Sequence, residues 1–107
     1  MSQFKPLPPL QELQQAFDYD PVTGIFHNKY TRSSNAIQGK VAGSKHFQRG
    51  VPHCVYLILK KRPLMGHRVA WYLMTGTDPL ARDVDHRDRN PFNNAFSNLR
   101  MSNKSQN

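Results

Sequence analysis

The feature that most constrains this chain is a polar segment near its C-terminal end, residues 84–100. It opens with Val84, Asp85 and His86, and an apolar residue followed by this pair predicts a short strand. A stretch rich in Asn, Asp and Pro follows, which is the composition of a loop, and the step Asn98-Leu99-Arg100 predicts the start of a helix. A carboxylate beside an imidazole can hold a hard divalent cation while the imidazole activates a water. Hydrolysis of a phosphodiester needs both parts.

The same residues have a simpler interpretation, in which they only build a polar turn. Asx residues crowd turns because their side chains hydrogen-bond to the local backbone. The residues concerned are Asp85, Asn90, Asn93 and Asn94. An adjacent Asp and His is common by chance, so the neighbouring sequence must decide between the two interpretations.

The charge distribution favours a polyanionic partner. The net charge is +8, and no Asp or Glu occurs between Pro21 and Thr77. That stretch carries Lys29, Arg32, Lys40, Lys45, Arg49, Lys60, Lys61, Arg62 and Arg68. A solvated surface that only aids solubility usually mixes both signs, so a stretch of one sign indicates contacts with phosphates.

Several classes of protein are disfavoured by composition. No run approaches the ~20 apolar residues of a membrane span, and the first residues do not predict a signal peptide. The single cysteine, Cys54, allows no internal disulfide and no cysteine-based zinc site, and we expect it to be buried in a strand. By default we expect a cytoplasmic protein.

The hydrophobic pattern predicts an α+β fold with one small antiparallel sheet of about three strands. Residues 1–9 predict an extended arm. Helical spacing predicts helices over 9–17 and 67–75, the second ended by Gly76 and packed on the sheet by Trp71. Strands are predicted at 25–27, 39–44, 53–59 and around 64–65, with loops at 18–24, 30–37 and 45–52.

A set of short motifs in the last part of the chain resembles a known family. In order these are His-Arg-Val-Ala-Trp from His67, Thr-Gly, Val-Asp-His, Asn-Asn, Ser-Asn-Leu-Arg and Ser-Gln-Asn. Together they resemble the HNH endonucleases of bacteriophages and mobile introns, in particular those whose third signature residue is Asn. The segment 19–26 is similar to the opening of many phage members. The joint order and spacing, rather than any one motif, carry the resemblance.

The resemblance implies a C-terminal ββα-metal unit, with Val84-Asp85-His86 as its first strand and its loop and second strand within residues 87–97. It also assigns roles in this unit. Asp85 would bind one divalent metal, Mg²⁺ or Mn²⁺ with Zn²⁺ as a further option, and His86 would be the general base. The second protein ligand would be Asn107, the last residue. Asn98 would pin the loop and orient the histidine, with Asn94 as an alternative for the pinning role. The implied helix would begin at Asn98 and dock through Leu99 and Met101.

The remaining assignments concern double-stranded DNA. Arg87, Arg89 and Arg100 lie close enough in sequence to the pair to neutralise the scissile phosphate. Lys60, Lys61 and Arg62 sit at the tip of the best predicted hairpin and predict backbone contacts. Such modules usually press the ββα unit onto the minor groove and read little sequence there, which leaves specificity to the sheet of residues 23–65 or to the arm. Arg68 points either at phosphate or at a core carbonyl, and His67 is expected to be a satisfied structural histidine.

We therefore expect a single HNH endonuclease domain over 1–107. Its parts would be an arm with a short helix (1–20), a basic DNA-binding part (21–76) and the catalytic motif (77–107). The metal would stabilise the leaving 3′-oxygen while water activated by His86 attacks phosphorus. The alternative is a non-catalytic DNA-binding or inhibitory protein that kept a truncated HNH fold, because the chain stops at the last ligand. A structural zinc module fits poorly, since Cys and His are few. The oligomeric state, monomer or homodimer, stays open.

Overall fold

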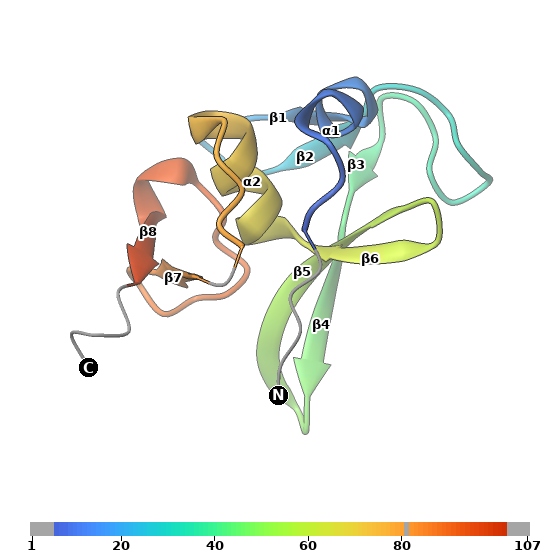
Figure 1. Cartoon of the computed structure of the whole chain (residues 1–107). Helices are drawn as coiled ribbons and strands as arrows, with labels where there is room; N and C mark the ends of the chain where they lie inside the picture. The colour runs from blue at the N-terminus through green and yellow to red at the C-terminus, as the bar shows by residue number, and fades with distance from the viewer. Residues whose placement is uncertain (1–5, 81, 103–107) are drawn as a thin grey trace.

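The computed structural model describes residues 6–80 and 82–102 and is an α+β arrangement of small antiparallel sheets and two helices (Figure 1). The helices are α1 (Leu10–Ala16) and α2 (Gly66–Thr75). The strands are β1 (Phe17–Tyr19), β2 (Phe26–Asn28), β3 (Val41–Ala42), β4 (Ser44–Gln48), β5 (Val51–Leu59), β6 (Arg62–Met65), β7 (Asp83–His86) and β8 (Leu99–Ser102). Within the described residues, neither helix is long and apolar enough to cross a membrane.

The strands form three sheets, where the sequence predicted one small sheet and the two strands of a C-terminal ββα unit. Strands β1-β2-β3 make the first sheet, β4-β5-β6 the second, and β7-β8 a two-stranded third. Helix α2 lies between them and buries Val69 and Ala70 against Leu57 and Leu13, which explains its apolar spacing. Gly76 ends this helix in a left-handed conformation, φ 76°, as predicted. The predicted burial of Cys54 in a strand is also confirmed.

Trp71 packs against the core cluster, which includes strand residues such as Leu57 and Leu99, and it also contacts the loop before β8. Its ring lies against Phe96, with the ring centroids 5.5 Å apart. Phe96 belongs to η1 (Phe96–Asn98), a 3-10 turn that leads into β8. Trp71 therefore also ties α2 to the loop that follows β7.

The prediction of a loop over 45–52 is wrong. Strands β4 and β5 pair there as a two-stranded ribbon, residues 44–56, which stands away from the body of the molecule in Figure 1. Its tip is the tight turn at Arg49-Gly50, where φ is 52° and 80°. Two consecutive positive φ values match the right-handed twist of a two-residue hairpin. Every residue from Ser44 to Pro52 is exposed, so no alternation of buried and exposed side chains marked the strands in the sequence.

The prediction of a helix from Asn98 is also wrong. Leu99 to Ser102 form β8, which pairs with β7 so that Asp85 lies opposite Arg100 and His86 opposite Leu99. Leu99 and Met101 are two residues apart, the spacing of one face of a strand, and both pack on the core. The first strand of the expected unit is therefore present as β7, but its second strand follows Asn98 as β8 instead of lying within residues 87–97. Any helix after them would fall in residues 103–107, outside the described residues.

Candidate functional site

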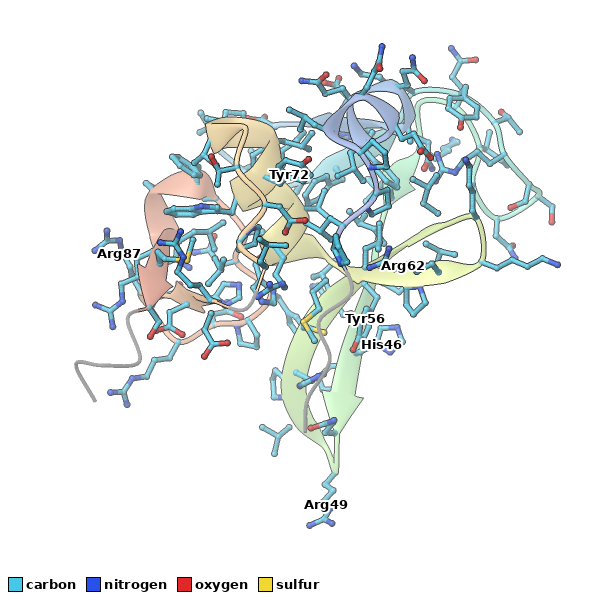
Figure 2. All side chains as sticks on the ribbon, viewed as in Figure 1. His46, Arg49, Tyr56, Arg62, Tyr72 and Arg87 are labelled. Atoms are coloured by element: carbon cyan, nitrogen blue, oxygen red, sulfur yellow. The ribbon has the colours of Figure 1, made fainter. Side chains whose placement is uncertain are left out.

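A cleft of about 440 Å³ lies between the root of the ribbon and the β7–β8 hairpin. Its lining residues are Pro52, His53, Asp85, His86, Arg87, Arg89, Pro91 and Arg100. One carboxylate, two histidines and three arginines thus share one small concavity. Figure 2 shows Arg87 projecting outward from the end of β7 beside the loop.

His86 has one ring nitrogen fixed by a hydrogen bond. Its Nε2 lies 2.8 Å from Oδ1 of Asn94. An amide oxygen can only accept, so the Nε2–H group of His86 donates this hydrogen bond. In the neutral ring the lone pair then lies on Nδ1. That nitrogen is the one able to take a proton from a water.

Asn94 is itself held by the N-terminal part of the chain. It is 2% exposed, and its backbone carbonyl accepts a 2.5 Å hydrogen bond from the hydroxyl of Tyr19. Burial, with a smaller contribution from Asp20, raises the pKa of Tyr19 to about 12, so the hydroxyl remains a donor. The backbone of Gly24, with φ 77°, packs directly on the Asn94–Ala95 peptide, and a Cβ there would come within 2.2 Å of it. The segment 19–26 therefore braces the loop that orients His86.

Asn98 pins the loop between β7 and β8 but makes no hydrogen bond to the His86 side chain within the described residues. Its amide nitrogen donates to Oδ1 of Asp88 and to the Asn93 carbonyl, both at 2.9 Å, and its Oδ1 accepts from the Asp88 N–H at 3.0 Å. Hydrogen bonds from Asn93, Asn90 and Asn98, in that order, lower the pKa of Asp88. Asn98 thus hydrogen-bonds within the loop, whereas the side chain that hydrogen-bonds to the histidine is Asn94, which the sequence offered only as an alternative for pinning the loop.

Asp85 differs from Asp88 because its carboxylate is uncommitted. Among residues 6–80 and 82–102, nothing forms a hydrogen bond or an ion pair with it, and it faces the cleft half-exposed. A carboxylate oxygen open to solvent is a suitable donor for a hard divalent cation. The described residues hold no group of three or more His, Cys, Asp or Glu side chains able to bind a metal, so water or phosphate would have to complete its coordination. Asn107, the expected second ligand, lies outside the described residues.

Comparison with known proteins finds a match to the C-terminal part of the chain. Residues 65–107 match the family model described as HNH endonuclease. This confirms the resemblance read from the sequence. The matched region runs from the end of β6 through α2, β7 and β8, and it includes Asp85, His86 and Asn98. No curated protein and no solved structure matches the chain. The HNH match indicates a nuclease-type function on nucleic acid, and HNH nucleases generally use a divalent metal.

His67, near the start of the matched residues 65–107, lies directly against His86. The ring centroids are 4.9 Å apart with an interplanar angle of 60°. Its Nδ1 is buried and has no hydrogen-bond partner in the described part of the chain, so the expectation of a fully satisfied histidine is wrong. Burial lowers its pKa to about 3, with smaller contributions from the neighbouring His86, Arg68 and His53. His67 is therefore a neutral ring that backs the His86 imidazole.

The predicted cationic residues fall into two groups. Arg87, Arg89 and Arg100 line the cleft of the HNH region. Arg68 instead donates to the backbone carbonyls of Leu80 and Arg82, which are exposed, so it bonds the backbone but not a carbonyl of the core.

The three cations of the β5–β6 tip lie on the opposite side of the molecule from β7 in Figure 1. Lys60 forms a 2.9 Å ion pair with Glu12, and Arg62 donates to the Pro6 carbonyl at 2.7 Å. Lys60 and Lys61 border a separate groove of about 990 Å³ between the two three-stranded sheets. Contact between this tip and DNA remains a prediction.

Proposed function

We propose that this protein is a metal-dependent endonuclease that hydrolyses double-stranded DNA at the cleft, with His86 as its general base. The observation that carries the proposal is the His86–Asn94 hydrogen bond, because it leaves Nδ1 unprotonated in a cleft lined by three arginines. A base fixed in one tautomer can accept a proton without first rearranging. The match of this region to the HNH endonucleases supports the same conclusion.

The proposed reaction uses each nitrogen of His86 differently. Nδ1 takes a proton from a water molecule, and the water oxygen forms a bond to phosphorus. The bond between phosphorus and the 3′-oxygen breaks, and that oxygen takes up a proton from solvent, which leaves a 5′-phosphate and a 3′-hydroxyl. Throughout, Nε2 donates to Asn94, so the imidazolium that forms is held in place.

The arginines of the cleft would neutralise the phosphate that is attacked. Arg87 and Arg89 lie one and three residues after His86, and Arg100 lies across the hairpin from Asp85. Guanidinium groups form paired, charge-assisted hydrogen bonds to phosphate oxygens. Their clustering beside a single carboxylate gives the cleft a positive character suited to a DNA strand.

Asp85, with Asn107 as second protein ligand, would hold one Mg²⁺ or Mn²⁺ ion. When bound, the ion supplies positive charge that stabilises the leaving 3′-oxygen. With so few protein ligands, the site depends on its one charged member. Asp88 is unsuited to the role because its oxygens are occupied by Asn93, Asn90 and Asn98.

The test is cleavage of supercoiled plasmid by the intact chain with Mg²⁺, Mn²⁺ or Zn²⁺, against chelator. We expect metal-dependent nicking or linearisation that Asp85→Ala abolishes and that raised Mg²⁺ does not restore. Asp83→Ala is the matched control, because Asp83 is an exposed carboxylate at the far end of the same strand, and it should cut normally. Normal cutting by Asp85→Ala would remove this residue from the site. DNA that is bound and never cut by the wild type would favour the non-catalytic alternative.

A further inference from the structure

The ribbon formed by β4 and β5 is exposed along its whole outer length. Phe47 and Val51 are 57% and 62% exposed, although both are apolar. Figure 2 shows Arg49 at the very tip, pointing away from the body of the protein. None of the side chains from 44 to 51 makes a hydrogen bond within the part of the chain that the structure describes. A projecting element with unsatisfied donors and uncovered apolar groups is built to meet a partner.

We propose that this ribbon enters the major groove of the DNA duplex cut at the cleft. The inference rests on the proposed function, since it takes duplex DNA as the substrate. It adds the element that grips the substrate and the groove into which that element fits.

The width of the ribbon selects the groove. Two paired strands lie ~4.8 Å apart, and side chains bring such a ribbon to roughly 10 Å. The major groove, ~12 Å wide and ~8.5 Å deep, admits a two-stranded ribbon, whereas the minor groove is only ~6 Å wide. The five residues of β4, at ~3.3 Å each, are long enough to reach the groove floor.

The side chains of the ribbon suit DNA and not another copy of the chain. Lys45 and Arg49 are cationic and lie in the stretch without acidic residues, so two ribbons would repel each other. Arg49 and Gln48 can hydrogen-bond to base edges, and Phe47 and Val51 can contact thymine methyl groups. Strand β4 is also an edge strand, and its positive charge disfavours pairing with a second β4.

The ribbon is joined to the catalytic side by aromatic contacts. The Phe47 ring lies 5.3 Å from the Phe92 ring, and the Lys45 ammonium lies 5.5 Å from the same ring. Pro52 and His53, at the root of the ribbon, line the cleft together with Asp85 and His86. A DNA strand that borders the groove filled by the ribbon would therefore pass through the cleft beside His86.

The test measures binding apart from cutting, by fluorescence anisotropy with His86→Ala protein. Two duplexes of equal sequence are compared, one unmodified and one whose cytosines carry glucosylated hydroxymethyl groups, which fill the major groove. We expect affinity for the modified duplex to fall by about tenfold or more, the value of one or two lost base contacts. Netropsin, which fills the minor groove, should lower the affinity for the unmodified duplex much less than the modified cytosines do.

Two ribbon variants make the assignment specific. Arg49→Asn removes the tip charge and leaves an Asn-Gly turn, which favours the same hairpin, and Phe47→Ser removes the apolar contact. Both should bind unmodified DNA about tenfold more weakly and should discriminate less between the two duplexes. Lys40→Ala, which removes an equal exposed charge outside the ribbon, should lose about twofold and keep the discrimination.

Equal affinity of the parent protein for both duplexes would overturn the inference. The inference would also be overturned if Arg49→Asn and Phe47→Ser both discriminated between the two duplexes as fully as the parent protein does. Wild-type protein that shows this groove preference and never cuts DNA would leave the inference standing while refuting the proposed nuclease function.

Discussion

Two hairpins border the cleft, and they are held in opposite ways. In the β7–β8 loop the polar side chains bond to one another and to the local backbone, as Asp88, Asn93 and Asn98 do. In the ribbon the residues from 44 to 52 are all exposed, and ring contacts with Phe92 connect it to the loop. The β7–β8 loop is thus held by its own hydrogen bonds, whereas the ribbon is exposed and open to a partner.

The β7–β8 loop and the ribbon are therefore suited to different tasks. Chemistry at phosphorus needs a base held in one orientation before the substrate arrives, because misplacement by about 1 Å can cost on the order of 10²-fold in rate. An element that enters a groove needs free donors and side chains able to adapt. Changes on the loop side should therefore alter turnover or folding, and changes on the ribbon should alter affinity.

The largest effect on the β7–β8 loop should come from Gly24→Ala. The new methyl group would meet the Asn94–Ala95 backbone at 2.2 Å, in a residue with φ 77°. We expect a loss of about 3 kcal/mol or more in the free energy of unfolding, from strain and overpacking together. Denaturant titration measures it. Gly39→Ala is the matched control, because Gly39 has φ 81° and nothing within 4 Å of its added Cβ, and it should lose only about 1 kcal/mol. Equal losses would show that Gly24 does not brace the loop.

Asn94→Ala should separate orientation from binding. Without its Oδ1 the imidazole of His86 loses its tautomer lock, and we expect kcat to fall about 10–100-fold while affinity for DNA changes little. Asn94→Asp keeps an acceptor oxygen and should recover part of the rate. Single-turnover cleavage and anisotropy on the same samples measure both quantities. A variant that loses affinity and keeps its rate would place Asn94 on the binding side of the comparison.

A smaller effect should come from the buried ring behind His86. The pKa of His67 is about 3 in the folded protein and 6.5 when exposed, so below pH 6.5 protons bind the unfolded chain and not the folded one. The free energy of unfolding should therefore decrease as the pH is lowered below 6.5, by up to about 1.4 kcal/mol per pH unit. Chemical unfolding of wild type and His67→Phe between pH 4 and 6.5 tests this, and the variant should have the shallower slope. Parallel slopes would mean that His67 is solvated in the folded state.

Much of the fold could be predicted because burial leaves a periodic trace. The apolar spacing of α2 and the alternation of β5 both face the core, so both were found. The ribbon left no such trace, since its exposed strands obey no rule of burial. Strand β8 was missed because the Asn98-Leu99-Arg100 step was taken for a helix start, although Leu99 and Met101 already had the spacing of a strand.

The position of the candidate site could be predicted from the sequence, but the residues that hold its side chains in place could not. Asp85 and His86 are adjacent in the chain, so their proximity needed no fold. Asn94 depends on Tyr19 and Gly24, which lie some seventy residues away in sequence and reach it only through tertiary packing. The weak similarity of segment 19–26 to phage HNH proteins was the one signal that pointed to these residues.

The most direct test of the account is plasmid cleavage and DNA binding by wild type and His86→Ala in the same Mg²⁺ buffer. His27→Ala, which alters a half-buried histidine on β2, serves as the control and should behave as wild type. A general base contributes about 10²–10⁴-fold to rate, so His86→Ala should lose that much cleavage while its affinity for DNA stays within a few-fold. Cleavage by His86→Ala at close to the wild-type rate would contradict the assignment of the base, and with it the account of the cleft.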